Sequence, residues 1–200
     1  MEKEPPHARP TVAGIRARAP RRDAQERREA LIAAAADCFA EQGYRVPLEE
    51  VADRAGVGRA TLYRNFKDRE ALALAIFGRE VDRMAALLNP AASIDRTLTE
   101  MIRSGARAST LFARISSELK LDEENTAAFK ALGARLAGML GPTVAAAQAR
   151  GELRGDVSAA QLVTTIRMIG GLLLPHWSEQ EKSEQIAAAL DMLLRGLRPR

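Results

Sequence analysis

The residues best suited to binding chemistry lie together between positions 59 and 69. Their long or amide-bearing side chains are Arg59, Arg64, Asn65, Lys67 and Arg69, and the only acid among them is Asp68. Arginine pairs with guanine, and asparagine with adenine, through two hydrogen bonds in the major groove of DNA. Lysine and arginine also neutralise phosphates, which positions a protein without reading the base sequence. The stretch therefore predicts a nucleic-acid contact, provided that a helix turns these side chains outward.

Two short helices separated by a glycine turn would present this stretch. The first runs from Pro47 to Ala55, with proline in its first turn, where a missing N–H is harmless. The second runs from Arg59 to Phe66, and Gly56 between them can take the positive φ of a sharp reversal. The outward side chains would be Arg59, Ala60, Thr61, Tyr63, Arg64 and Asn65, followed by Lys67 and Arg69. This pattern is typical of a helix-turn-helix whose second helix enters the major groove.

Helices are expected throughout the chain, which predicts an all-α fold. Aromatic residues make up only 4% of the sequence, and no segment alternates β-branched and polar residues. Capping boxes mark three expected helix starts, at Asp23, Ser158 and Ser178. The expected domains are a flexible basic arm over 1–22, a helix-turn-helix domain over 23–67, a connecting helix over 68–88 and a C-terminal domain over 92–200. Helices of the C-terminal domain are expected over 93–108, 110–120, 123–150, 158–174 and 178–197.

Composition and charge narrow the class of protein. The net charge is +4, and residues 1–22 account for it with six basic and two acidic side chains. Such an arm can follow DNA, although a solvated tail is the alternative. The single cysteine, Cys38, excludes an internal disulfide and falls on an apolar helix face. The charged N-terminus is unlike a signal peptide, and the apolar run over 169–175 is too short for a bilayer, so we expect a soluble cytoplasmic protein.

Motifs for catalysis or for cofactor binding are missing from the sequence. His7 and His176 are far apart and poorly accompanied, which argues against a metal site. Neither a glycine-rich phosphate loop nor a G-x-S-x-G elbow occurs. We therefore expect no cofactor, no metal and no catalytic residue.

The motifs between about residues 30 and 77 resemble those of the tetracycline-repressor (TetR) family of transcriptional regulators. The matching residues are Ala35-x-x-x-Phe39-x-x-x-Gly43-Tyr44, Val51-Ala-x-x-Ala-Gly-Val57 and Thr61-Leu-Tyr63-x-x-Phe66-x-x-Arg69-Glu70-x-Leu72. The sequence departs from the family at two helix starts. The link after Tyr44 is one residue shorter than the common pattern, with Pro47 where Ser or Thr often caps, and Gly58 stands where many members have a capping Ser. The rest of the chain matches the family only in the number and length of its helices.

The resemblance implies a role for each outward residue of the second helix. Arg59, Ala60 and Asn65 would face base edges of operator DNA. The residues that would hold phosphates and fix the register are Thr61, Tyr63, Arg64, Lys67 and Arg69. A packing role for Tyr63, with solvated arginines around it, is the alternative.

The C-terminal domain would then bind a small effector and form a homodimer. The candidate ligand residues, which an ordinary core would also use, are Met101, Phe112, Ile115, Leu119, Phe129, Leu132, Leu136, Met139 and Trp177. Because few charges lie among them, we expect a mainly apolar effector. Two apolar stripes predict a dimer, since their exposure in a monomer would leave an unusually large patch. The stripes are Leu162, Ile166, Ile169 and Leu173, and Leu190, Leu193, Leu194 and Leu197.

The sequence leaves three other functions open. A constitutive DNA-binding protein without a ligand would have a filled C-terminal core. A small helical enzyme carrying a helix-turn-helix would need convergent titratable residues beyond position 90, and none occur at a telling spacing. Membrane-surface binding through the arm is disfavoured because the arm lacks apolar anchors. The expected function is therefore a ligand-responsive repressor that binds operator DNA as a homodimer.

Overall fold

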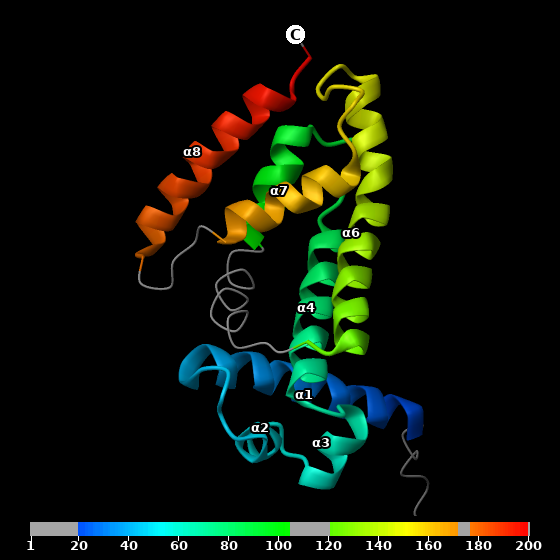
Figure 1. Ribbon diagram of the computed structural model, residues 1–200, viewed down its shortest axis with the longest axis vertical. Coiled ribbons are helices and arrows are strands. Elements are labelled where there is room, and N and C mark those ends of the chain that lie inside the picture. Colours follow the sequence, from blue (N-terminus) through cyan, green and yellow to red (C-terminus); the bar gives the residue numbers. More distant parts are fainter. Residues whose placement is uncertain (1–19, 105–120, 172–176, 200) are drawn as a thin grey trace, which may run out of the picture.

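The computed structural model describes residues 20–104, 121–171 and 177–199, and its regular structure there is entirely helical (Figure 1). The expected all-α fold is therefore confirmed. The helices are α1 (Pro20–Gln42), α2 (Leu48–Arg54), α3 (Arg59–Asn65), α4 (Arg69–Ala86), a helix that includes residues 94–104, α6 (Glu123–Ala149), α7 (Ala159–Gly171) and α8 (Glu179–Leu197). The helix expected over 110–120 lies outside the described residues.

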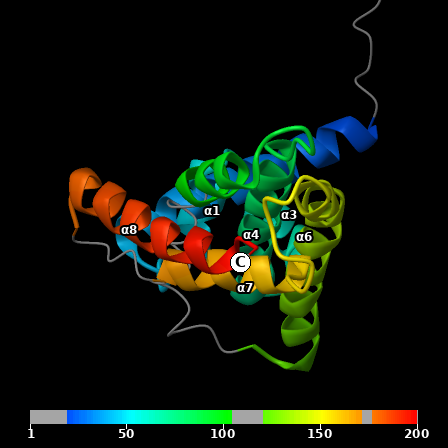
Figure 2. The ribbon, with the colours of Figure 1, turned by 90° about the horizontal axis from the view of Figure 1, so that it is seen from above.

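The molecule is elongated, with α1, α2 and α3 at one end and α7 and α8 towards the other (Figure 1). We call α1–α3 with the first half of α4 the headpiece, and the helices after residue 90 the body. Helices α4 and α6 run side by side along the long axis and connect the two parts. Helix α7 packs against α6, whereas α8 lies farther from α6, on the opposite side of the body (Figure 2).

A buried apolar cluster holds the headpiece together. Phe39 of α1 is fully buried and meets the ring of Tyr44 edge-on, with 5.4 Å between ring centroids. Leu62 of α3 and Leu72 of α4 are buried in the same cluster, which therefore fixes the recognition helix to the connecting helix. Cys38 also lies here, and its burial raises the pKa of the thiol. This buried position agrees with the apolar helix face on which the sequence places the cysteine.

The body has a second apolar cluster and a set of arginine contacts at its far end. Arg150 donates to the carbonyls of Pro90 and Ala92, at 2.8 Å each, which ties the end of α6 to the loop after α4. Arg154 donates to the carbonyl of Gly196 at 2.9 Å, which ties the loop after α6 to the end of α8. The loops at this end are thus fixed by charge-assisted hydrogen bonds to backbone oxygens.

Most of the expected helix starts are confirmed, and one is wrong. Asp68 caps α4 by accepting from the Ala71 N–H at 2.6 Å, and Ser178 opens α8 with a complete capping box. Ser158 makes the corresponding contacts before α7. Asp23, however, lies within α1, which includes Pro20. A proline is readily placed in the first turn of a helix, so the Asp23 motif was not needed as a start.

The glycine turn between α2 and α3 has the expected conformation. Gly56 has a φ of +66°, in the left-handed region, whereas Gly58 has a φ of −71° and precedes α3 without a side-chain cap. A Cβ on Gly58 would meet no atom within 4 Å. The same substitution should therefore have opposite effects at these two positions.

We predict that Gly58→Ser raises the free energy of unfolding, while Gly56→Ser lowers it. A serine at Gly58 would cap α3 and restrict the unfolded chain, for a gain of about 0.5–1 kcal/mol. At Gly56 the side chain would occupy a left-handed conformation, at a cost of about 1–2 kcal/mol. Urea unfolding followed by circular dichroism measures both. If Gly58→Ser lowers the free energy of unfolding, a serine at this position does not cap α3 and the prediction is wrong.

Candidate nucleic-acid interface

The N-terminal turn of α3 presents an exposed and weakly held arginine. The Arg59 side chain is 67% exposed and pairs with Glu49 of α2 at 2.9 Å. Its guanidinium lies 5.6 Å from the centre of the Tyr63 ring, and Tyr63 itself is 44% exposed. Because exposed ion pairs contribute at most about 1 kcal/mol, a stronger partner can displace Glu49. Arg59, Ala60 and Tyr63 thus all lie on the outer surface, as the sequence predicts.

The other polar residues of α3 are engaged within the helix. Arg64 is exposed and donates to the hydroxyl of Thr61 at 2.9 Å. The Asn65 amide donates to the carbonyl of Thr61 at 2.8 Å, and Asn65 is half-buried at the end of the helix. Its backbone carbonyl accepts from Arg28 of α1 at 3.2 Å. In the free protein the Asn65 side chain is therefore committed to its own helix.

Arg28 is a residue of this region that sequence analysis did not identify. Its guanidinium lies 4.4 Å from the centre of the Phe66 ring, in addition to bonding the carbonyl of Asn65. These contacts hold the end of α3 against α1. The pairing spans 37 residues, and no local pattern in the sequence indicates it.

Arg69, expected to bind phosphate, is occupied inside the headpiece. It donates to the carbonyls of Tyr44 and Val46, the latter at 2.6 Å, and its guanidinium lies within 6 Å of the centres of two aromatic rings. The neighbouring Tyr44 hydroxyl donates to Glu70 at 3.0 Å, and burial followed by this carboxylate raises the pKa of Tyr44. Arg69 thus fastens the loop before α2 to α4, and we leave it out of the proposed phosphate contacts.

Lys67 lies between the headpiece and the first turn of α6. Its ammonium pairs with Glu124 and, at 3.4 Å, with Asp122. The hydrogen bond to Glu124, followed by that to Asp122, raises the pKa of Lys67. Lys67 is therefore a firmly protonated cation that has carboxylate partners in the free protein.

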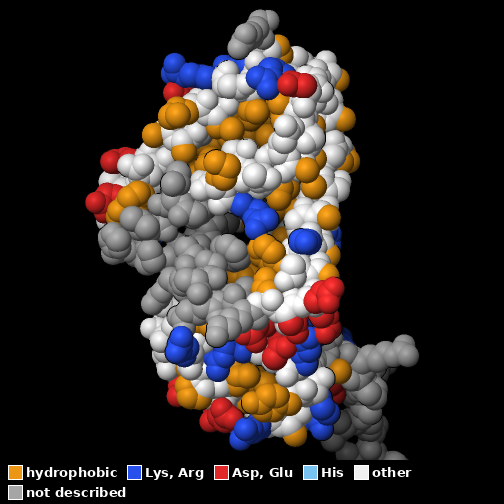
Figure 3. All heavy atoms as spheres, viewed as in Figure 1, with side chains coloured by type: hydrophobic (Ala, Val, Ile, Leu, Met, Phe, Trp, Pro, Cys, Tyr) orange, Lys and Arg blue, Asp and Glu red, His pale blue; other side chains and the backbone are white. Residues whose placement is uncertain are grey.

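On the face shown in Figure 3, acidic side chains gather where the headpiece meets the body, and basic, acidic and apolar side chains mix over the headpiece.

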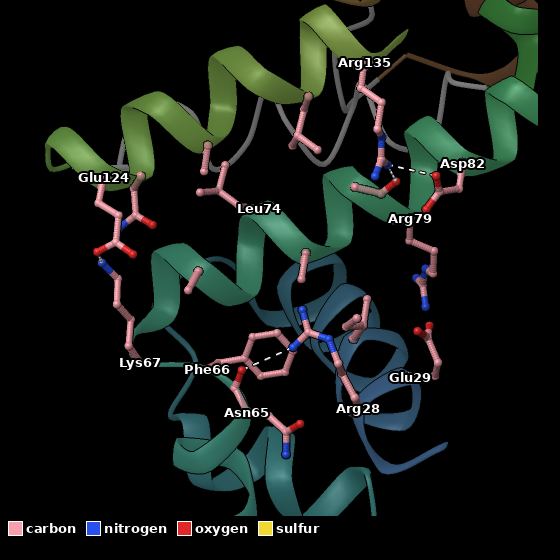
Figure 4. Close-up of a pocket in the computed structure, with 17 residues that line it drawn as sticks. Arg28, Glu29, Asn65, Phe66, Lys67, Leu74, Arg79, Asp82, Glu124 and Arg135 are labelled. Atoms are coloured by element: carbon pink, nitrogen blue, oxygen red, sulfur yellow. Dashed lines mark hydrogen bonds and ion pairs between the residues drawn. The ribbon is translucent and has the colours of Figure 1, made fainter. Parts of the chain in front are cut away.

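An open hollow of about 570 Å³ lies beside Lys67, between α1, α4 and α6 (Figure 4). Its walls include Leu74 and Leu132, and its rim is charged. One side is closed by Arg135 of α6, which pairs with Asp82 at 2.9 Å and donates to the Gly78 carbonyl at 3.0 Å. The hollow thus lies between two polar contacts of α6, one made by Glu124 with Lys67 and one made by Arg135 with Asp82 of α4.

The residues expected to line a ligand site are not gathered around one described cavity. Met101 and Leu136 are buried in the body core, and Leu132 packs against both apolar clusters. Met139 is 37% exposed, and Phe129 packs against the headpiece cluster beneath Arg167 of α7. Trp177 is half-buried. Phe112, Ile115 and Leu119 lie outside the described residues.

The stripes expected to form the dimer are largely covered within one chain. Fully or nearly fully buried members are Leu162, Ile166, Ile169 and Leu190. Leu193, Leu194 and Leu197 pack partly buried against the same body cluster, and Leu173 lies outside the described residues. The premise that the stripes are exposed in a monomer is therefore wrong for Leu162, Ile166, Ile169 and Leu190, while the role of the stripes in a dimer stays a prediction. Among the described side chains of these helices, the large apolar ones that are exposed are Met168, at 68%, and Met192, at 76%.

The described parts of the chain contain neither a metal-binding cluster nor a membrane-spanning helix. In 20–104, 121–171 and 177–199, no three His, Cys, Asp or Glu residues come together as metal ligands would. Within these same ranges, no helix combines the length and the apolar character needed to cross a membrane.

The fold is that of a helix-turn-helix protein with a helical C-terminal body. The model for bacterial regulatory proteins of the tetR family matches residues 31–76. The crystal structure of the TetR transcription regulatory protein from Mycobacterium vanbaalenii is similar over 90% of this chain and 99% of that one, with 31% identity and a TM-score of 0.58. The chain belongs to the TetR family of transcriptional regulators.

Two further relatives are similar in sequence. The transcriptional activator FasR of Mycolicibacterium smegmatis is 39% identical over 75 residues, which is 37% of this chain and only 34% of that protein. The transcriptional repressor Rv1474c of Mycobacterium tuberculosis is 24% identical over 175 residues, covering 86% of this chain and 93% of the repressor. The second similarity therefore extends through the body, whereas the first spans about a third of its relative.

Proposed function

We propose that this regulator is a repressor that binds operator DNA through α3, as a homodimer, and is released by a small effector. The observation that carries the proposal is the exposed N-terminal turn of α3, where an exposed ion pair with Glu49 and the ring of Tyr63 hold Arg59 weakly. The similarity to Rv1474c over most of both chains supports repression over activation. Arg59 and Ala60 face base edges in this proposal, and Thr61, Tyr63, Arg64 and Lys67 contact phosphates. Asn65 joins the base contacts only if its amide leaves the Thr61 carbonyl.

We predict that Arg59→Ala changes the DNA sequence that the protein selects from a random pool. A bidentate arginine discriminates its base by about 1–3 kcal/mol, so preference should relax at one position of each half-site. Tyr63→Ala is the comparison variant, because loss of a phosphate contact should weaken all sequences alike. If Arg59→Ala selects the same sequence with the same stringency, Arg59 does not read a base.

The dimer is proposed to form through outward faces of α7 and α8. Met168 and Met192 are largely exposed in the single chain, and long flexible apolar side chains in this state are common at interfaces. The leucine and isoleucine stripes of the same helices then act indirectly, by packing α7 and α8 against the body. A four-helix bundle of two helices from each protomer would cover both methionines.

We predict that Met192→Glu yields monomers that lose operator affinity. A carboxylate placed in the apolar centre of an interface is costly to desolvate, and two headpieces bind one duplex only when the dimer holds them together. Met139→Glu is the matched control, because Met139 is exposed on α6 and should leave the dimer intact. Sedimentation of the unmodified protein as a monomer would remove the basis of this proposal.

The effector is proposed to reach Thr143 in the middle of α6. The Thr143 hydroxyl is fully buried and has no hydrogen-bond partner among the residues that the structure describes. It lies on the helix face of Leu136, Leu140 and Val144, which faces the body core. A buried hydroxyl without a partner costs about 1–3 kcal/mol. An apolar effector with one polar group would relieve this cost, and such differential binding is what shifts a regulator between two states.

We predict that Thr143→Val raises the stability of the free protein by about 1 kcal/mol and weakens release from DNA by the effector. The control is Thr97→Val, since Thr97 is equally buried but its hydroxyl donates to the Ser93 carbonyl at 3.1 Å. That substitution should lower stability instead. The measurement is thermal unfolding, followed by a screen for compounds that release the selected duplex. A loss of stability in both variants would show that Thr143 is already hydrogen-bonded, and would move the effector's polar contact elsewhere.

A further inference from the structure

A single polar junction joins the start of α4 to the start of α6. Asp68 caps α4, and Asp122 caps α6 by accepting from the Asn125 N–H at 2.7 Å. Asn125 is buried, and its side-chain amide donates to Asp68 at 3.5 Å. The two helix starts therefore meet at this point, where one long hydrogen bond joins them.

Lys67 is the cation of this junction, and it comes from the DNA-binding end of the chain. It follows α3 by two residues, and its ammonium has three carboxylates nearby, on Glu124, Asp122 and Asp68. The backbone N–H of Asn125, followed by Lys67, lowers the pKa of Asp122, so this carboxylate stays charged. Two of the three carboxylates that surround Lys67 thus belong to the start of α6, whereas Lys67 belongs to the headpiece.

The exposure of these groups makes the pairing exchangeable. The side chains of Lys67, Asp122 and Glu124 are 41%, 57% and 78% exposed. Ion pairs in such positions are weak and screened by salt, so another anion can replace the carboxylates at small cost. A DNA phosphate beside α3 is an anion of this kind, and both anions need the same ammonium group.

We propose that Glu124 and Asp122 compete with DNA phosphate for Lys67, so that the position of α6 sets whether the headpiece uses this phosphate contact. The inference rests on the proposed DNA binding. Glu124 and Asp122 are positioning residues in this scheme, since they act on DNA only through Lys67. A shift of the first turn of α6 away from Lys67 strengthens binding, and a shift towards it weakens binding.

The test measures affinity for a duplex of random sequence between about 50 and 200 mM salt, where phosphate contacts dominate. E124Q removes one competing charge and keeps the size of the side chain. We expect about two- to fivefold tighter binding at low salt, as for loss of one exposed ion pair, and a salt dependence steeper by up to about 0.9 in log–log slope. Circular dichroism establishes that each variant keeps the helical fold.

E123Q is the matched control, because Glu123 lies in the same turn of α6 and makes no described contact with Lys67. It removes the same charge, so its effect measures general repulsion of DNA alone. In a K67A background, E124Q should then behave as E123Q does. Two results would overturn the competition while leaving DNA binding intact. One is an equal effect of E124Q and E123Q on the affinity of the unmodified chain. The other is a K67A variant whose affinity for DNA has the same salt dependence as that of the unmodified chain. Failure of the unmodified protein to bind any duplex would instead overturn the proposed function itself.

Discussion

The structure depends on one helix being buried in two cores at once. The first turns of α4 place Leu72, Ala73 and Ile76 in the headpiece cluster, and its later turns place Val81 in the body cluster. Leu132 of α6 packs against both clusters, and polar links at Lys67 and Arg135 flank that contact. Because packed interiors resist deformation, a displacement of α6 cannot be absorbed locally and must be shared with α4. Buried apolar contacts of α4 and α6 thus attach the headpiece to the body, and the ion pairs of Lys67 and Arg135 lie at the edges of these contacts.

Local features of the fold could be predicted because their causes lie within a few residues. Asp68, Ser158 and Ser178 each act on an N–H three residues away, so the sequence pattern contains the whole interaction. Gly56 is similar, since the demand for a positive φ arises in the turn itself. The family motifs concentrate in residues 31–76, so they too predict the headpiece from residues that are close together in the sequence.

Long-range features could not be predicted, because an amphipathic pattern shows that a face is buried and not what covers it. The stripe containing Leu162 and Ile166 predicts a buried face, and the chain's own body covers these two residues before any second protomer is added. Arg69 carries a charge typical of phosphate contacts, yet backbone carbonyls 23 and 25 residues earlier take up its donors. The partners of Lys67 lie 55 and 57 residues away, beyond the reach of any local motif. The sequence pattern singles out these residues, but their partners follow only from the three-dimensional fold.

The two cores also differ in how the chain must assemble them. The headpiece cluster is formed almost wholly by the continuous stretch from Leu31 to Phe77, whereas the body cluster joins Val81 to Leu190. Helical units with such local contacts fold in microseconds to milliseconds. At roughly 10 residues per second, synthesis of the chain between the two ends of the body cluster takes about 10 seconds. We therefore expect the nascent headpiece to be folded, with α4 leaving it as a half-buried stem, long before the helix that closes the body exists.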